Sequence, residues 1–233
     1  MMGLTPDEWQ ALRLSLEVSA AAVLVSLPLG VAVAHLLARR QFPGKALVET
    51  AVNLPLVLPP VVTGYLLLVL FGRQGLLGSR LEAWFGVQFV FDWKGAALAA
   101  AVVSFPLMVR AMRVAFTSVD RKLEGAARSL GAGPWDCFFS VTLPLARHGL
   151  IAGAVLAFAR SLGEFGATMM VAGNMPGRTQ TIPLYIFDLY NSPGGTVRAE
   201  RIVVVSIVLS LAALAGSEWL LRREQRLTGT LPT

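Results

Sequence analysis

Two charged side chains stand inside an otherwise apolar stretch of this sequence. Arg160 and Glu164 lie four residues apart within 148–173, a spacing that brings two side chains together on one face of a helix. Charges in apolar segments are usually paired or face a polar cavity, so two interpretations are open. Either the two side chains form an internal ion pair, or a passing anion is met by Arg160 or by the hydroxyls of Ser161 and Thr168.

The sequence lacks the motifs of the common catalytic centres. HExxH and GxSxG are absent, and the two histidines, His35 and His148, are isolated. The single cysteine, Cys137, excludes an internal disulfide and has no neighbouring ligands at metal spacing. A Walker A loop needs GxxxxGK followed by Ser or Thr, whereas RRQFPGKAL at 39–47 lacks the first Gly and has Ala after its Lys. We therefore expect no catalytic residue, metal or cofactor in this chain.

The apolar residues form long blocks with the charged residues between them. The 233-residue chain is 55% hydrophobic and 15% charged, against roughly 25% charged residues in a soluble domain. A helix needs about 20 mainly apolar residues to cross a bilayer. The pattern predicts an all-α integral membrane protein with one domain over 1–233. Its five spans are expected at about 14–38, 50–72, 93–110, 148–173 and 202–221, with 179–190 as a re-entrant or interfacial segment or a sixth span.

The distribution of Lys and Arg predicts the orientation, because these residues concentrate in cytoplasmic loops. With the N-terminus outside, twelve of the twenty fall in inside segments and eight in outside segments. This bias places 120–144 and the C-terminus in the cytoplasm. The inside set is Arg39, Arg40, Lys45, Arg110, Arg113, Arg121, Lys122, Arg128, Arg147, Arg222, Arg223 and Arg226.

The second predicted span contains three prolines, Pro55, Pro59 and Pro60. Each removes a backbone donor, so we expect a kink and carbonyl groups that need other partners. Thr63 and Gly64 follow about one turn later. Either this segment is part of a translocation path and its gate, or the kink only shapes packing, because Pro and Gly are frequent in membrane helices.

A charged, glycine-punctuated segment, EGAARSLGAGPWDCFFSVTLP at 124–144, separates the third and fourth predicted spans. Asp120 can start a helix and Gly131 can end it, and a second short helix can run from Pro134 to before Pro144. The unit is either a docking element for another protein or a solvated connection. Helical spacing predicts an apolar face of Leu123, Ala126, Ala127 and Leu130 and an opposite face with Arg121, Glu124 and Arg128.

The spacing of this segment resembles the EAA motif of ABC importer permeases, which runs EAA, three residues, Gly, nine residues, Ile, one residue and Leu-Pro. The acidic position of the motif holds Gly125, with Glu124 one residue earlier, and Val141 replaces Ile. In that family the segment forms coupling helices that sit in a cleft of a cytoplasmic ATPase subunit. The resemblance implies this role for Glu124, Ala126, Ala127, Gly131, Val141, Leu143 and Pro144.

Three further stretches resemble the permease subunit of molybdate ABC importers, which belongs with the sulfate and tungstate permeases. They are LPLVLPPVVTGYLLL at 54–68, SFPLMVRAMR at 104–113 and AFARSLGEFGAT at 157–168. The resemblance implies a type I, MetI-like fold and a homodimer in the bacterial cytoplasmic (inner) membrane. It also implies two ATPase subunits that bind ATP and Mg²⁺, and a periplasmic or lipid-anchored oxyanion-binding protein. Molybdate is the expected cargo, with tungstate, sulfate or thiosulfate as alternatives.

Other classes of protein fit the sequence less well. A secondary transporter driven by an ion gradient would show an inverted repeat and buried carboxylates in corresponding halves, but Glu164 is the only mid-segment acid of the central spans. The basic residues are scattered, which argues against nucleic-acid binding. The outer segment 173–188 is either a structured docking loop for the binding protein or a plain outer loop. The candidate path residues are Pro59, Pro60, Thr63, Gly64, Arg160, Ser161, Glu164 and Thr168.

Overall fold

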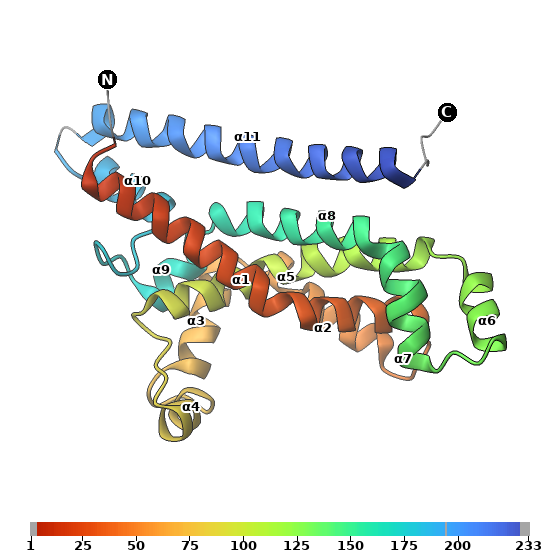
Figure 1. Cartoon of the computed structure of the whole chain (residues 1–233). Helices are drawn as coiled ribbons and strands as arrows, with labels where there is room; N and C mark the ends of the chain where they lie inside the picture. The colour runs from red at the N-terminus through yellow and green to blue at the C-terminus, as the bar shows by residue number, and fades with distance from the viewer. Residues whose placement is uncertain (1–3, 194, 229–233) are drawn as a thin grey trace.

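The computed structural model describes residues 4–193 and 195–228, and all regular structure in these ranges is helical. The long helices run along the same dimension of the molecule (Figure 1), with α5 packed against α1 and α8, and α8 also against α11. The all-α fold class is confirmed. The helices are α1 (Pro6–Arg39), α2 (Lys45–Val57), α3 (Pro60–Phe71), α4 (Gly78–Phe85), α5 (Trp93–Ser118), α6 (Arg121–Ser129), α7 (Pro134–Cys137), α8 (Leu143–Leu162), α9 (Gly166–Ala172), α10 (Ile182–Tyr190) and α11 (Gly195–Thr228), with a π-helical turn, η1 (Phe138–Thr142).

Helices cover all five stretches in which a span is predicted. Within the described residues, four helices are long and apolar enough to cross a membrane, and the pair α2 and α3 makes a fifth if it counts as one span. The nine residues of α10 are too few to cross a bilayer, so 179–190 contains no sixth span. The predicted inside residues Arg222, Arg223 and Arg226 have side chains outside the described set.

Two predicted spans are broken, and α1, α5 and α11 are longer than the spans predicted there. α2 and α3 are bent by 115°, because the adjacent Pro59 and Pro60 supply no backbone donors where the helix would continue. The span predicted at 148–173 ends as α8 at Leu162 and resumes as α9 at Gly166. α5 continues beyond Arg110 to Ser118.

Small residues line the helix contacts around α5. Its first half buries Ala96, Ala97, Ala99 and Ala100, and its second half buries Met108, Met112 and Phe116. Small side chains let membrane helices approach closely. α3 and α9 also approach closely, since a Cβ on Gly64 would lie 2.7 Å from Ala167 Cα and 2.8 Å from its carbonyl oxygen.

The start of α1 is held by polar contacts. Thr5 and Glu8 form a capping box, in which each backbone N–H donates to the other side chain at 2.7 and 3.3 Å. Glu8 Oε1 also accepts hydrogen bonds from Arg201 at the beginning of α11, at 2.8 and 3.0 Å. These contacts fix the first turn of α1 to α11.

The segment 173–188 is packed against the helices. Thr179, Gln180 and Thr181 are buried, and the Ile182 N–H donates to Ser15 Oγ in α1 at 2.7 Å. Partial burial raises the pKa of the Tyr185 phenol above its usual value, so this group stays protonated at neutral pH. The segment is therefore a structured loop rather than a plain solvated one.

Candidate functional site

The segment between α5 and α8 forms two short helices at one end of the molecule (Figure 1). The Asp120 side chain caps α6 by accepting from the Lys122 N–H at 2.8 Å, and Gly131 turns the chain with φ +95°. Glycine adopts this left-handed conformation without strain. The predicted start and end of the first helix are therefore confirmed.

The sequence predicts that the second short helix ends before Pro144, and this prediction is wrong. Pro134–Leu162 forms one continuous 29-residue helical stretch. The π-helical turn η1 ends at Thr142, and Pro144 follows as the second residue of α8, in a first turn that tolerates a residue without a backbone donor. The short helix and the membrane helix α8 are therefore one element.

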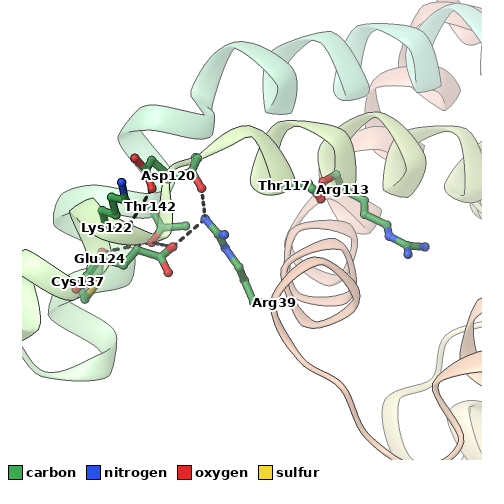
Figure 2. Close-up of polar contacts among 9 residues, drawn as sticks. Arg39, Arg113, Thr117, Asp120, Lys122, Glu124, Cys137 and Thr142 are labelled. Carbon is green, nitrogen blue, oxygen red and sulfur yellow. Dashed lines mark hydrogen bonds and ion pairs between the residues drawn. The ribbon is translucent and has the colours of Figure 1, made fainter.

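Glu124 points from α6 toward the bundle and meets Arg39 at the end of α1 (Figure 2). Glu124 Oε1 lies 2.9 Å from Arg39 Nη2 and accepts a hydrogen bond from Thr142 Oγ1 at 2.8 Å. Arg39 Nη2 also donates to the Val119 carbonyl at 2.9 Å. The two charged side chains are only 9% and 13% exposed, so the contact is screened little by solvent. One carboxylate thus joins α1, α6 and η1.

Cys137 lies beside this contact. Its thiol is buried and free, and Sγ donates weakly to the Glu124 carbonyl at 3.8 Å. Within the described residues, no group of three or more His, Cys, Asp or Glu side chains is placed to hold a metal ion. Cys137 therefore acts as a small packing residue between α6 and α7.

The apolar face of α6 points away from the bundle. α6 buries none of its residues, and Leu123 and Leu130 are 49% and 90% exposed. In α7 and η1, the rings of Trp135 and Phe139 stack with centroids 6.2 Å apart while remaining largely exposed. We call Leu123, Leu130, Trp135 and Phe139 the end surface. Of the other motif residues, Ala126, Gly131 and Pro144 are exposed, and Ala127, Val141 and Leu143 are half-buried.

Arg160 and Glu164 form the internal ion pair that is one of the two interpretations of their spacing. Arg160 Nη1 lies 2.9 Å from Glu164 Oε2. Glu164 Oε1 accepts the Ala167 N–H at 3.0 Å, which caps the start of α9. The Glu164 side chain is 2% exposed, whereas that of Arg160 is 33% exposed. The carboxylate therefore serves two structural contacts, and part of the guanidinium stays accessible.

Most of the other candidate path residues gather around α9. Thr63 and Gly64 in α3 and Thr168 in α9 are buried where these helices pack. A Cβ on Gly166 would lie 3.1 Å from Pro60 Cβ, which places the α2–α3 bend beside the break between α8 and α9. Within the described part of the chain, the buried hydroxyls of Thr63 and Ser161 have no hydrogen-bond partner, while Pro59 is exposed at the bend.

Sequence reasoning missed Arg39 and Thr142 as partners of Glu124. Arg39 is visible in the sequence only as one of several basic residues near a span end, and no periodicity links it to a residue in another loop. Thr142 occupies the unassigned position between the motif's Val141 and Leu143. The motif could have drawn attention to Thr142, but only the fold brings Arg39 to it.

Residues 26–225 match the family described as the inner membrane component of binding-protein-dependent transport systems. The chain belongs to this family. It is therefore a multi-span transport permease, a non-enzymatic membrane subunit.

This permease is 58% identical over 228 residues to the molybdenum transport system permease protein ModB of Escherichia coli K12, covering 98% of the chain and 100% of the relative. It is 40% identical over 181 residues to the sulfate transport system permease protein CysW of Synechococcus elongatus, covering 78% and 63% of the two chains. A solved bacterial alginate ABC transporter, in complex with an alginate pentasaccharide-bound periplasmic protein, matches with a TM-score of 0.74 at 18% identity, over 94% of the permease and 80% of that chain. The last match supports the fold.

Proposed function

We propose that this permease is the membrane subunit of an ATP-driven molybdate importer. The observation that carries the proposal is the 58% identity to a molybdenum permease across its full length. The sulfate permease is less similar and matches over a shorter stretch. The whole chain acts as one membrane domain, two copies form the translocation unit, and a separate binding protein delivers the oxyanion.

ATP is bound by a separate cytoplasmic ATPase subunit, because the sequence has no Walker A loop. The end surface is the contact for this subunit. Its Leu130 and Trp135 side chains are 90% and 75% exposed, and large apolar side chains gathered in this way mark interaction sites. The small motif residues Ala126 and Gly131 let the ATPase subunit approach the backbone closely.

Two features carry a displacement of the end surface into the membrane. The helical stretch Pro134–Leu162 is continuous, so a push at Trp135 moves α8 as a rigid element up to Arg160. The Glu124–Arg39 contact passes the same displacement to α1. A nucleotide-driven clamp that favours one arrangement of these helices shifts the population between two states of the permease.

The translocation path follows the α2–α3 bend and the break between α8 and α9. Arg160 offers the oxyanion a cation, while Glu164 offsets part of its charge at 2.9 Å. This arrangement attracts an anion without holding it tightly, as a path must. Ser161, Thr63 and Thr168 supply hydroxyls, Gly64 allows the close α3–α9 crossing, and Pro59 and Pro60 form the gate.

The end with α6 faces the cytoplasm and the start of α1 faces the outside, in line with the excess of Lys and Arg in the inside segments. The packed loop 173–188 then lies at the outer face, where the binding protein docks. The solved alginate transporter was captured with its periplasmic protein, which supports an outer partner for this fold.

Uptake of radiolabelled molybdate at trace concentration tests the cargo. Cells without this gene should lose uptake, and the intact gene should restore it. In the parent cells, excess tungstate should block uptake because it is a tetrahedral dianion of nearly the same size, whereas excess sulfate should not. Unchanged molybdate uptake together with lost sulfate uptake would reject molybdate and assign the permease to sulfate.

A further inference from the structure

A cavity of about 320 Å³ lies between the end of α1 and the unit formed by α6 and α7. Its polar lining consists mainly of basic side chains. Arg39, Arg40 and His35 come from the end of α1, and Arg121, Arg128 and Glu124 come from α6. A single water needs only roughly 10 to 15 Å³ of such space, so the cavity has room for a small hydrated ion.

The charges around this cavity are not balanced by the chain. Arg39 is paired with Glu124, which is the only carboxylate of the lining. The side chains of Arg40, Arg121 and Arg128 make no ion pair or hydrogen bond with any residue that the structure describes. Like charges repel, so an anion in the cavity would relieve a real cost.

One buried hydrogen-bond donor beside the cavity also lacks an acceptor. Arg39 Nε is buried without a hydrogen-bond partner within the described residues, in a side chain that is only 9% exposed. A buried N–H without an acceptor loses its hydrogen bond to water and gains none in return, which destabilises the folded state. Guanidinium groups present planar forks of donors that match the oxygens of phosphate-like anions. The unsatisfied donor and the uncompensated charges therefore point to the same kind of ligand.

We propose that this cavity binds a tetrahedral oxyanion of the phosphate class. The oxyanion is either free in solution or the headgroup phosphate of an anionic phospholipid, because both present the same charged oxygens. A bound oxyanion contacts arginines of α1 and of α6 at once. It therefore fixes α6 against α1 in parallel with the Glu124–Arg39 pair, whichever cargo the permease carries.

Binding of radiolabelled inorganic phosphate to the full-length chain tests the proposal, with the chain held in phosphatidylcholine nanodiscs. We expect saturable binding that Arg128→Gln and Arg121→Gln each weaken about tenfold, because each removes charge-assisted hydrogen bonds. Arg80→Gln is the matched control, since Arg80 is an exposed arginine on α4 and does not line the cavity. It should leave binding unchanged. Both test residues are exposed, so the variants should keep the thermal midpoint of the parent.

Nanodiscs that also contain phosphatidylglycerol distinguish a site for free phosphate from a site for a lipid headgroup. If the lipid headgroup is the ligand, phosphatidylglycerol displaces free phosphate, whereas a site for free anions binds phosphate equally in both discs. The proposal is wrong if neither disc gives saturable binding, or if the two test variants bind phosphate like the parent. It is also wrong if assembly with the ATPase subunit abolishes binding, because the cavity would then belong to the docking contact. The measurement needs no transport, so its failure is distinguishable from failure of the molybdate assignment.

Discussion

Two regions of this permease are held together by different kinds of contact. At the α3–α9 crossing, Gly64 faces the backbone of Ala167 so closely that no side chain fits between them. In the segment between α5 and α8, by contrast, α6 buries none of its residues and is joined to α1 through the Glu124–Arg39 pair. Close backbone packing leaves one arrangement available, whereas a polar contact can break and re-form. The comparison indicates a rigid α3–α9 crossing near the candidate path and an α6 whose contact with α1 can open and close.

Adding one methyl group should destabilise the α3–α9 crossing but not α6. Gly64→Ala places a Cβ 2.7 Å from Ala167 Cα, and we expect it to reduce stability by about 3 kcal/mol. Gly125→Ala is the matched control, because a Cβ there meets nothing within 4 Å and alanine favours a helix by about 0.5 to 1 kcal/mol. Thermal unfolding in detergent measures both. Equal midpoints for the two variants would contradict a rigid crossing.

Removing one charge should loosen α6 without unfolding the bundle. Glu124→Gln leaves the nearly buried Arg39 without its ion-pair partner, and we expect local opening of α6 to become easier by about 2 kcal/mol. Hydrogen exchange of the amides in 121–130 measures this opening. Glu49→Gln is the control, since its pair with Arg113 at 3.0 Å is far more exposed. That variant should change stability by less than about 1 kcal/mol and leave α6 exchange as in the parent. Unchanged exchange in Glu124→Gln would show that other contacts hold α6.

The turn between α6 and α7 should tolerate a side chain at one glycine and not at the other. Gly131 has φ +95°, so Gly131→Asp should strain the turn by about 1 to 2 kcal/mol and uncouple the permease from its ATPase. Gly133→Asp is matched in exposure but has φ −67° and precedes α7 as its N-cap, a position that favours Asp. Co-purification of the ATPase subunit and molybdate uptake report the difference. Normal co-purification and uptake in Gly131→Asp would contradict the coupling role of this segment.

The sequence alone predicts the parts of the fold that depend on local chemistry. The α6 boundaries follow from Asp120 and Gly131, and the α2–α3 bend follows from adjacent prolines. The break before α9 was missed because Gly163 carries no distinct signal, since glycine is frequent in membrane helices. Helical spacing also defines two faces of α6 but cannot say which one meets the bundle. That choice depends on Arg39, which is remote in sequence and is brought near only by the packing of α1 against α5 and α8.

The bend between α2 and α3 has a consequence for the hydration of the cargo. The 13 and 12 residues of these helices give lengths of about 20 and 18 Å, so neither helix alone crosses the roughly 30 Å hydrocarbon layer. Pro59 and Pro60 also leave the carbonyls of Pro55 and Leu56 without their usual helical donors. Because such groups do not remain unsatisfied in lipid, the bend must either be buried in protein or face water. On the proposed path, water at the bend would let a passing dianion keep part of its hydration shell, so that the distance travelled without water would be shorter than the membrane is thick.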